Sequence, residues 1–159
     1  MSPQSGIGVA PSKGAEEENF PVGSWLLPVR LRPYVALFYN VLRAADDIAD
    51  HADLTAAQKI AGLDAVDRAL AGETPVAKGC ENAARLAAEL GEIDVTVDHA
   101  RALLVAFKQD ATKNRYSDWR DLMGYCHNSA NPVGRFLLDL HGEGEIGHGA
   151  SDALCTALQ

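Results

Sequence analysis

Three observations predict that this chain folds as an all-α helical domain. From about Phe20 onward the sequence is rich in Ala and Leu and shows little of the alternation of β-branched and polar residues that is typical of strands. Gly, Pro and helix-capping residues recur at the spacing of helix ends. The chain has 159 residues, 47% of them hydrophobic, so it is long enough for one domain with a hydrophobic core and too short for two.

The first 18 residues differ from the rest of the chain. They consist largely of Ser, Pro, Gly and Glu and can bury little apolar surface, so we expect a flexible arm. The helical domain is then expected to cover residues 19–159. Its first helix runs to about His51, with Pro28 and Pro33 before or within its first turns.

Three further helices are expected in the middle of the chain, where Ala and Leu recur at helical spacing. Asp53 or Thr55 caps the second helix, and Gly72 ends it. The third covers residues 75–91, and the fourth runs from about residue 95 to residue 113.

The fifth helix is expected to run from near Ser117 to around Gly142. It contains Pro132, which removes one backbone hydrogen bond, so a kink is predicted at residues 128–131. The stretch GEGEIGHG then forms a flexible connector. Ser151 caps a sixth helix, DALCTALQ, which is cut off after barely two turns.

Composition and charge exclude several classes of protein. The net charge of -8 argues against nucleic-acid binding, which needs clustered Lys and Arg. Cys80, Cys126 and Cys155 are widely spaced, so they predict a reducing compartment and neither a disulfide framework nor a zinc site. The sequence has no apolar run of roughly 18 residues and no signal peptide at its start. We therefore expect a cytoplasmic protein, at most peripheral to the inner membrane.

An acidic segment, RAADDIADHAD at residues 43–53, ends the first predicted helix. On a helical wheel, members of this segment and a preceding tyrosine fall within about 80° of one another: Tyr39, Arg43, Asp46, Asp50 and Asp53. Apolar residues cover most of the remaining circumference. The helix is therefore predicted to be largely buried, with this acidic stripe facing a cavity.

The stripe has the composition of a metal and phosphate site. Carboxylates one helical turn apart, about 6 Å, repel each other, and a divalent cation such as Mg²⁺ removes that repulsion. Arg43 is then placed to hold the anion that the cation bridges. The alternative is a solvated, charged helix end, although negative charge at a helix C-terminus is disfavoured by the dipole. His51, Asp47 and Asp53 are interpreted as ordinary surface residues.

A second group of residues surrounds the predicted kink. Ser129, Ala130 and Gly134 are small and leave room beside the helix. The neighbouring larger side chains form an apolar wall with one phenol in it: Leu122, Tyr125, Val133 and Phe136. This pattern predicts a channel for a long hydrocarbon, with a close helix–helix crossing at the small residues as the alternative.

Both groups of residues resemble motifs of one enzyme family. FYNVLRAADDIAD resembles the first aspartate-rich motif of the squalene/phytoene synthases, which are class I isoprenoid synthases with a helical bundle fold, and YCHNSANPVGR resembles their Y-C-x-x-x-A-x-x-V-G helix. The segments ENFPV, RY and SANPVG are most similar to the hydroxysqualene synthase branch of bacterial hopanoid pathways. The resemblance begins at Glu18 and runs to the last residue, where ALQ looks like the start of the second aspartate-rich motif. The chain then corresponds to the N-terminal portion of the bundle.

The resemblance implies a role for each of these motifs. It implies that Asp46 and Asp50 hold Mg²⁺ and that Arg43 and Tyr39 contact a diphosphate. Tyr125, Ser129 and Asn131 would line the site where a carbocation forms, with Tyr125 and Asn131 as the catalytic residues. The further substrate-binding residues implied are Asn19, Phe20, Arg115 and Gln159.

The activity implied is Mg²⁺-dependent conversion of presqualene diphosphate to hydroxysqualene in hopanoid and squalene biosynthesis. Diphosphate leaves, the carbon skeleton rearranges and one water adds, with Asn131 as the residue that positions this water. The alternatives are a squalene or phytoene synthase that joins two prenyl diphosphates, and a truncated, non-catalytic module that binds a polyprenyl diphosphate or a partner. No glycine-rich dinucleotide loop supports NADPH binding.

Two histidines depart from the pattern of the family. His51 and His127 stand where relatives often carry Glu and Arg, so the roles of these two residues stay open. The chain alone is expected to be inactive, to expose apolar surface and to be able to self-associate. Its expected ligand is a polyprenyl diphosphate, and peripheral membrane contact is compatible with that ligand.

Overall fold

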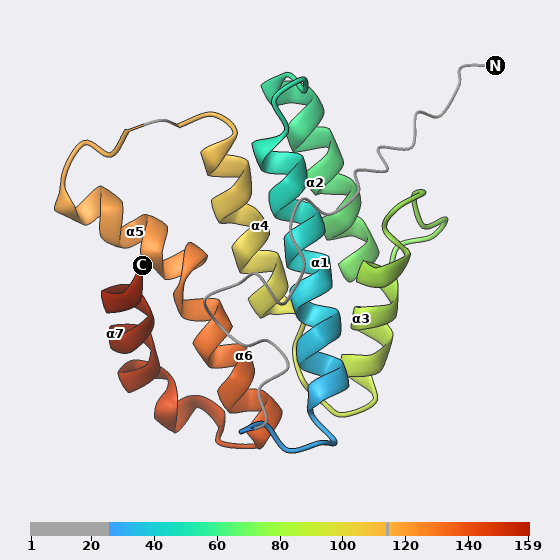
Figure 1. The fold of residues 1–159 in the computed structure, drawn as a ribbon, viewed down its shortest axis with the longest axis vertical. Helices are drawn as coiled ribbons and strands as arrows, with labels where there is room; N and C mark the ends of the chain where they lie inside the picture. Colours follow the sequence, from blue (N-terminus) through green and yellow to red (C-terminus); the bar gives the residue numbers. More distant parts are fainter. Residues whose placement is uncertain (1–25, 114) are drawn as a thin grey trace.

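The computed structural model describes residues 26–113 and 115–159. Within these ranges the chain forms seven α-helices and one short 3-10 turn (Figure 1), so the predicted all-α fold is confirmed. The elements are α1 (Arg32–Asp50), α2 (Ala56–Leu70), α3 (Glu81–Gly91), α4 (Asp98–Asp110), α5 (Trp119–Ser129), α6 (Asn131–His141), η1 (Gly144–Gly147) and α7 (His148–Leu158). None of these helices combines the length and the hydropathy needed to cross a bilayer. The predicted flexible arm, with Asn19 and Phe20 next to it, lies outside the described residues.

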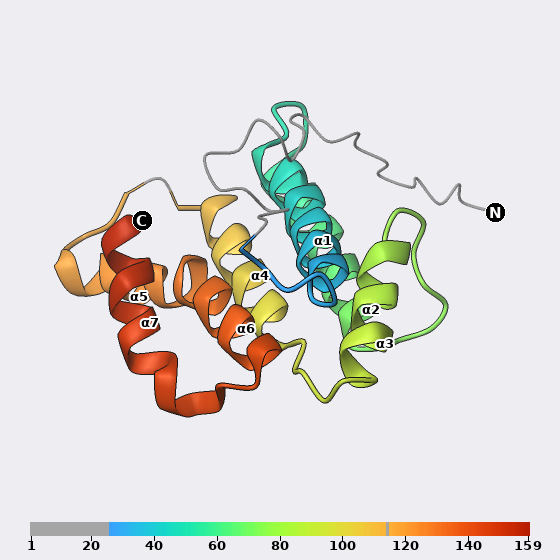
Figure 2. The same cartoon turned by 60° about the horizontal axis from the view of Figure 1, so that its bottom comes forward.

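Helix α1 lies near the centre of the bundle and packs against α2, α3 and α4. Helix α6 packs on α4 and carries α5 and α7, which lie at the opposite edge from α2 and α3 (Figures 1 and 2). The two halves of the bundle differ in burial. Five or more residues are buried on each of α1, α2 and α4, whereas α5 buries only Cys126 and no residue of α7 is fully buried.

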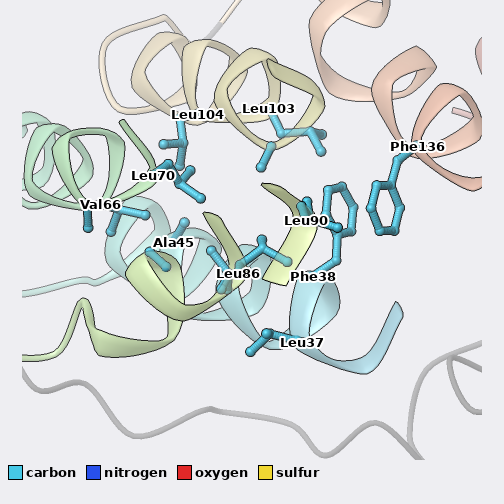
Figure 3. Close-up of a cluster of buried hydrophobic side chains, with 14 of the residues drawn as sticks. Leu37, Phe38, Ala45, Val66, Leu70, Leu86, Leu90, Leu103, Leu104 and Phe136 are labelled. Atoms are coloured by element: carbon cyan, nitrogen blue, oxygen red, sulfur yellow. The ribbon is translucent and has the colours of Figure 1, made fainter. Parts of the chain in front are cut away.

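The core fills the space between α1, α2, α3, α4 and α6 (Figure 3). Phe38 of α1 and Phe136 of α6 stack with ring centroids 3.8 Å apart and an interplanar angle of 4°. Phe136 is only 1% exposed, so its predicted place in a channel wall is wrong. The prediction that Phe136 and Val133 are apolar residues of one helix is correct, but they face different ways. Phe136 packs on Phe38 of α1, whereas Val133 lines a groove that is described below.

Several helix ends follow the local signals in the sequence. Thr55 caps α2 through a capping box, in which its hydroxyl accepts from the Gln58 N–H while the Gln58 side chain accepts from the Thr55 N–H. Pro33 lies in the first turn of α1, where no N–H is needed. Gly142 ends α6 with φ of 79°, a left-handed conformation that favours glycine.

Other boundaries differ from the prediction. The first helix ends at Asp50, so Asp53 lies beyond the acidic stripe and is exposed. The third helix begins at Glu81 instead of residue 75, because the Glu81 carboxylate accepts the Gly79 N–H just ahead of the first turn, at 2.9 Å. The sixth helix begins at His148, so Ser151 lies inside it and does not cap it. Most of the predicted flexible connector is η1 and the start of α7.

The predicted fifth helix is two helices. It breaks at Ala130, which ends α5 with an N–H bond to Cys126 and also stands at the N-cap of α6. Pro132 falls in the first turn of α6, where its missing N–H costs nothing. The kink was therefore predicted at the correct place, but the structure has a complete break there, at which α5 ends and α6 begins.

Asp139 joins three helices through two histidines. His99 of α4 donates from Nε2 to Asp139 Oδ2 at 2.5 Å, and His148 of α7 donates to Oδ1 at 2.8 Å. Burial raises the pKa of Asp139, but the hydrogen bonds from the two imidazoles outweigh it, and the resulting pKa lies below the ordinary value. This network attaches the start of α7 to the rest of the bundle.

We expect Asp139→Asn to lower the free energy of unfolding at pH 7 by about 1–3 kcal/mol, the range for hydrogen bonds to charged groups. Because the pKa of Asp139 is lowered by folding, its stabilisation is present above the unfolded pKa of about 3.9 and disappears as pH falls through the folded pKa. Urea unfolding followed by circular dichroism should therefore show the two proteins converging in acid. Glu145→Gln, at an exposed carboxyl, is the matched control. A constant difference at all pH values would contradict this role.

Candidate functional site

Helices α1 and α4 end on the same side of the molecule, at the top of Figure 1, and bring three carboxylates together. Asp46 and Asp50 lie in the last turns of α1, and Asp110 is the last residue of α4. We call these three residues the acidic corner. Burial raises the pKa of Asp46 and of Asp110, and the negative charge of Asp50 raises both further. Folding therefore disfavours the ionised forms of Asp46 and Asp110 in the acidic corner.

Arg43 lies one turn before the corner on α1. Its Nη1 donates to Asp46 Oδ2 at 2.8 Å, and its Nη2 lies 3.3 Å from Asp47 Oδ1. Asp47 has a side chain only 5% exposed, so its interpretation as a surface residue was wrong. Asp47 is buried because it lies on the inward face of α1, where the guanidinium of Arg43 provides a partner for its charge.

The donor set of the corner fits a hard divalent cation. Carboxylate oxygens are the ligands that such ions prefer, and a bound cation would relieve the repulsion that raises the pKa of Asp46. Across residues 26–113 and 115–159, however, no three His, Cys, Asp or Glu side chains are arranged to hold a metal by themselves. The corner therefore fits a cation that shares its remaining ligands with other groups, such as phosphate oxygens and water.

Tyr125 connects α5 to the corner. Its hydroxyl donates to Asp110 Oδ2 at 2.8 Å, and its ring lies 5.1 Å from the ring of Tyr116. Burial raises the pKa of Tyr125, and the hydrogen bond to Asp110 raises it further, so the phenol stays protonated at neutral pH. Asp110 could not be singled out from the sequence, because a lone Asp at the end of the AFKQD segment looks like any polar helix end.

Ser129 and Asn131 flank the break between α5 and α6. The Ser129 hydroxyl, one turn after Tyr125, is buried and lies close enough to the Tyr125 phenol to lower the pKa of that phenol. Asn131 is 6% exposed, and its Oδ1 accepts a hydrogen bond from Thr156 Oγ1 of α7 at 2.9 Å. The structure thus brings these two predicted residues to the place where α5, α6 and α7 meet.

An apolar groove with a volume of about 990 Å³ runs between α6 and α7. It is lined by Ala130, Val133, Gly134, Leu137, Leu138, His141, Gly147, Ala150, Ser151, Leu154, Cys155, Leu158 and Gln159. Of the predicted wall, Val133 alone lines this groove, since Phe136 is in the core and Leu122 and Tyr125 lie elsewhere on α5.

The predicted close helix–helix crossing is present at Gly134. A side chain at this position would collide with Ser151 Oγ and Cys155 Sγ, so glycine permits α7 to approach α6. The Arg135 guanidinium forms an ion pair with Asp152 across the same two helices, with Nε 2.8 Å from Oδ1. Gly134 also lines the apolar groove, so the groove lies beside this crossing of the two helices.

The remaining predicted residues have simpler surroundings. Tyr39 is half-buried and packs against the core on the acidic stripe. Arg115 is exposed in the loop between α4 and α5. Gln159 is exposed at the end of the chain and lines the groove. The structure therefore places Arg43, Asp46 and Asp50 together and joins Tyr125 to them through Asp110.

The sequence matches known proteins over nearly its whole length. It is 45% identical over 147 residues to the hydroxysqualene synthase of Rhodopseudomonas palustris, a match that covers 92% of this chain and 49% of that protein. It is 42% identical over 155 residues to the hydroxysqualene synthase of Sinorhizobium fredii, covering 98% of this chain and 52% of that protein. The chain therefore spans about half the length of these relatives.

A solved structure and a family profile agree with these matches. The crystal structure of squalene synthase HpnC from Alicyclobacillus acidocaldarius superposes with a TM-score of 0.74 at 33% identity, covering 91% of this chain and 55% of that one. The profile of the squalene/phytoene synthases matches residues 14–159. The helical bundle, the acidic corner and these likenesses lead to one conclusion: this chain belongs to the squalene/phytoene synthase family.

Proposed function

We propose that the full-length protein, meaning this chain together with the part that corresponds to the other half of its relatives, converts presqualene diphosphate to hydroxysqualene and releases diphosphate. One observation carries this proposal. Asp110 of the acidic corner accepts a hydrogen bond from Tyr125 of α5, and the apolar groove begins at Ala130, directly after the last residue of that helix. A substrate with a diphosphate head and a long hydrocarbon body needs this combination of surfaces.

Members of this family use a divalent metal ion, and we propose that the ion is Mg²⁺, held by Asp46 and Asp50 in part. When bound, this ion stabilises the negative charge of the departing diphosphate. Arg43 supports the same anion with its guanidinium, which is already held at the corner by Asp46 and Asp47. The acidic corner alone repels the diphosphate, so we expect ion and diphosphate to bind together.

The residues around the break between α5 and α6 would act on the carbon skeleton. When the carbon–oxygen bond breaks, its electron pair leaves with the diphosphate and positive charge remains on the carbon. The apolar groove would keep the hydrocarbon body of the substrate from bulk water, and the oxygens of Tyr125 and Ser129 near the end of α5 would offer the cation partial negative charge. One water then forms the new carbon–oxygen bond and loses a proton. Asn131, whose Oδ1 is held by Thr156, would position this water through its amide nitrogen.

The relatives favour this reaction over its alternatives. Proteins at 42–45% identity carry the name hydroxysqualene synthase, whereas the solved structure named a squalene synthase is 33% identical. Squalene formation is therefore the second candidate, because it shares the same corner and groove and differs in how the cation is quenched. A non-catalytic binding module is the third.

The proposal is tested by incubating the full-length protein with presqualene diphosphate and Mg²⁺ and identifying the products by mass spectrometry. We expect hydroxysqualene and inorganic diphosphate without any reductant. Squalene that forms only when NADPH is added would support the second candidate. Binding without turnover would support the module, and an absence of both would contradict all three.

We expect Asn131→Gly to shift products from hydroxysqualene toward other products of cation quenching, because the substitution deletes the amide that would position water. The fraction of alcohol among total products, measured by mass spectrometry, is the readout. Asn40→Gly, at an exposed position of α1, carries the same chemical change away from the site and should leave the product ratio unchanged. An unchanged alcohol fraction in Asn131→Gly would restrict Asn131 to its structural hydrogen bond with Thr156.

A further inference from the structure

Asp110 is the one carboxylate of the acidic corner that does not come from α1. It ends α4 and is half-buried, and its Oδ2 accepts the hydrogen bond from the Tyr125 hydroxyl at 2.8 Å. Its partner on α5 lies 15 residues further along the chain, across the loop that contains Arg115. A carboxylate that meets a phenol in a site expected to handle positive charge needs a functional explanation.

The hydrogen bond fixes which way the phenol points. A tyrosine hydroxyl has one proton and two lone pairs, and a carboxylate can only accept. Because the proton of Tyr125 is directed at Asp110, the lone pairs of the phenol oxygen are directed away from it. A second contact limits the ring, since Tyr116 packs against Tyr125 and the Lys113 ammonium lies 4.8 Å from the centroid of the Tyr116 ring. The phenol is thus oriented before any substrate binds.

A direct role for Asp110 as a metal ligand is less consistent with the geometry. The described residues contain no group of three acids, histidines or cysteines arranged around one ion, although Asp46, Asp50 and Asp110 affect one another electrostatically. One oxygen of Asp110 is also already occupied by the phenol. The two roles make different predictions for metal dependence, so an experiment can separate them.

We propose that Asp110 is a positioning residue that acts through Tyr125, holding the phenol so that its oxygen faces the carbon on which positive charge develops. This inference rests on the proposed function. An oriented oxygen dipole that needs no rearrangement stabilises a developing charge more than a freely rotating hydroxyl does. The negative charge of Asp110 behind the phenol adds to the potential at that oxygen. Asp110 itself touches neither the substrate nor the metal ion in this role.

The test uses the full-length protein with Asp110→Leu, Asp110→Asn and Tyr125→Phe, singly and combined. We expect Asp110→Leu to lower kcat by roughly 10- to 100-fold, somewhat less than the loss of a direct transition-state hydrogen bond. KM for presqualene diphosphate and the Mg²⁺ concentration for half-maximal rate should stay within about threefold. Asp110→Asn keeps an acceptor and should retain more activity than Asp110→Leu. Asp64→Asn is the control, because it removes a carboxylate of α2 that pairs with Lys108 of α4 and does not belong to the acidic corner.

The combined variant decides whether Asp110 acts through Tyr125. In the Tyr125→Phe background, Asp110→Leu should cause no further fall in kcat, because its partner is already gone. The same fold-change in both backgrounds would overturn the proposal. A large rise in the Mg²⁺ requirement of Asp110→Leu would also overturn it, in favour of a metal ligand.

A spectroscopic measurement separates this inference from the proposed function. With ¹³Cζ-labelled tyrosine, the Tyr125 resonance is assigned by its loss in Tyr125→Phe, and Asp110→Leu should shift it while Asp64→Asn should not. An unshifted resonance would overturn the role of Asp110 even if the enzyme is active. Failure of the unmodified protein to turn over presqualene diphosphate would instead contradict the proposed function, and with it this role in the reaction.

Discussion

Turnover of presqualene diphosphate by the full-length protein is expected to fall by about 10³-fold or more when either Asp46 or Asp50 is replaced by Asn. The substitution keeps the size of the side chain and removes the charge that would hold the divalent cation. Helix content should not change, and the stability of the Asp46→Asn variant should not fall. Burial and Asp50 raise the pKa of Asp46, which means that its ionised form is disfavoured by folding at neutral pH, so a neutral amide removes this cost.

Three measurements check this expectation. Steady-state kinetics gives turnover, circular dichroism gives helix content, and isothermal titration calorimetry with Mg²⁺ should show binding only when inorganic diphosphate is present. Asp53→Asn is the matched control, because Asp53 lies beyond the end of α1 and is exposed. Turnover like that of the unmodified protein in either corner variant would remove the acidic corner from the mechanism.

The chain of 159 residues is expected to have no synthase activity by itself and to self-associate in solution. The groove between α6 and α7 is open and apolar, and Leu154 and Leu158 at its edge are 62% and 79% exposed. A protein seldom leaves such a surface in contact with water. The relatives are about twice as long as this chain, so we expect the part of the protein that corresponds to their other half to cover the groove and to supply further ligands for the cation.

Light scattering and an activity assay test this expectation together. We expect oligomers from the chain alone, and Leu154→Glu should shift them toward monomers because it puts a charge in the groove. Val105→Glu changes an exposed apolar residue of α4 that does not line the groove and should have no such effect. Addition of the remaining half of the protein should restore turnover. A compact monomer that turns over presqualene diphosphate unaided would show that the catalytic apparatus lies elsewhere.

The sequence by itself determined the fold class and the features that depend on neighbours along the chain. The capping box at Thr55 and the glycine at Gly142 place helix ends within one or two residues, because a cap is a contact between residues that are close in sequence. The period of 3.6 residues placed Arg43 beside Asp46 in the same way. Motif resemblance identified the family because it compares local patterns, and the matches over residues 14–159 confirm it.

The tertiary structure alone decided which partner each helix face meets. Periodicity showed that Phe136 lies on an apolar face, but only packing assigns that face to Phe38 in the core and the next face to the groove. Asp47 differs from Asp46 by one position, and the inward turn of α1 buries it. The contact between Tyr125 and Asp110 joins two helices across a loop. Such contacts depend on how helices are oriented in space, and the spacing of residues along one helix carries no information about that orientation.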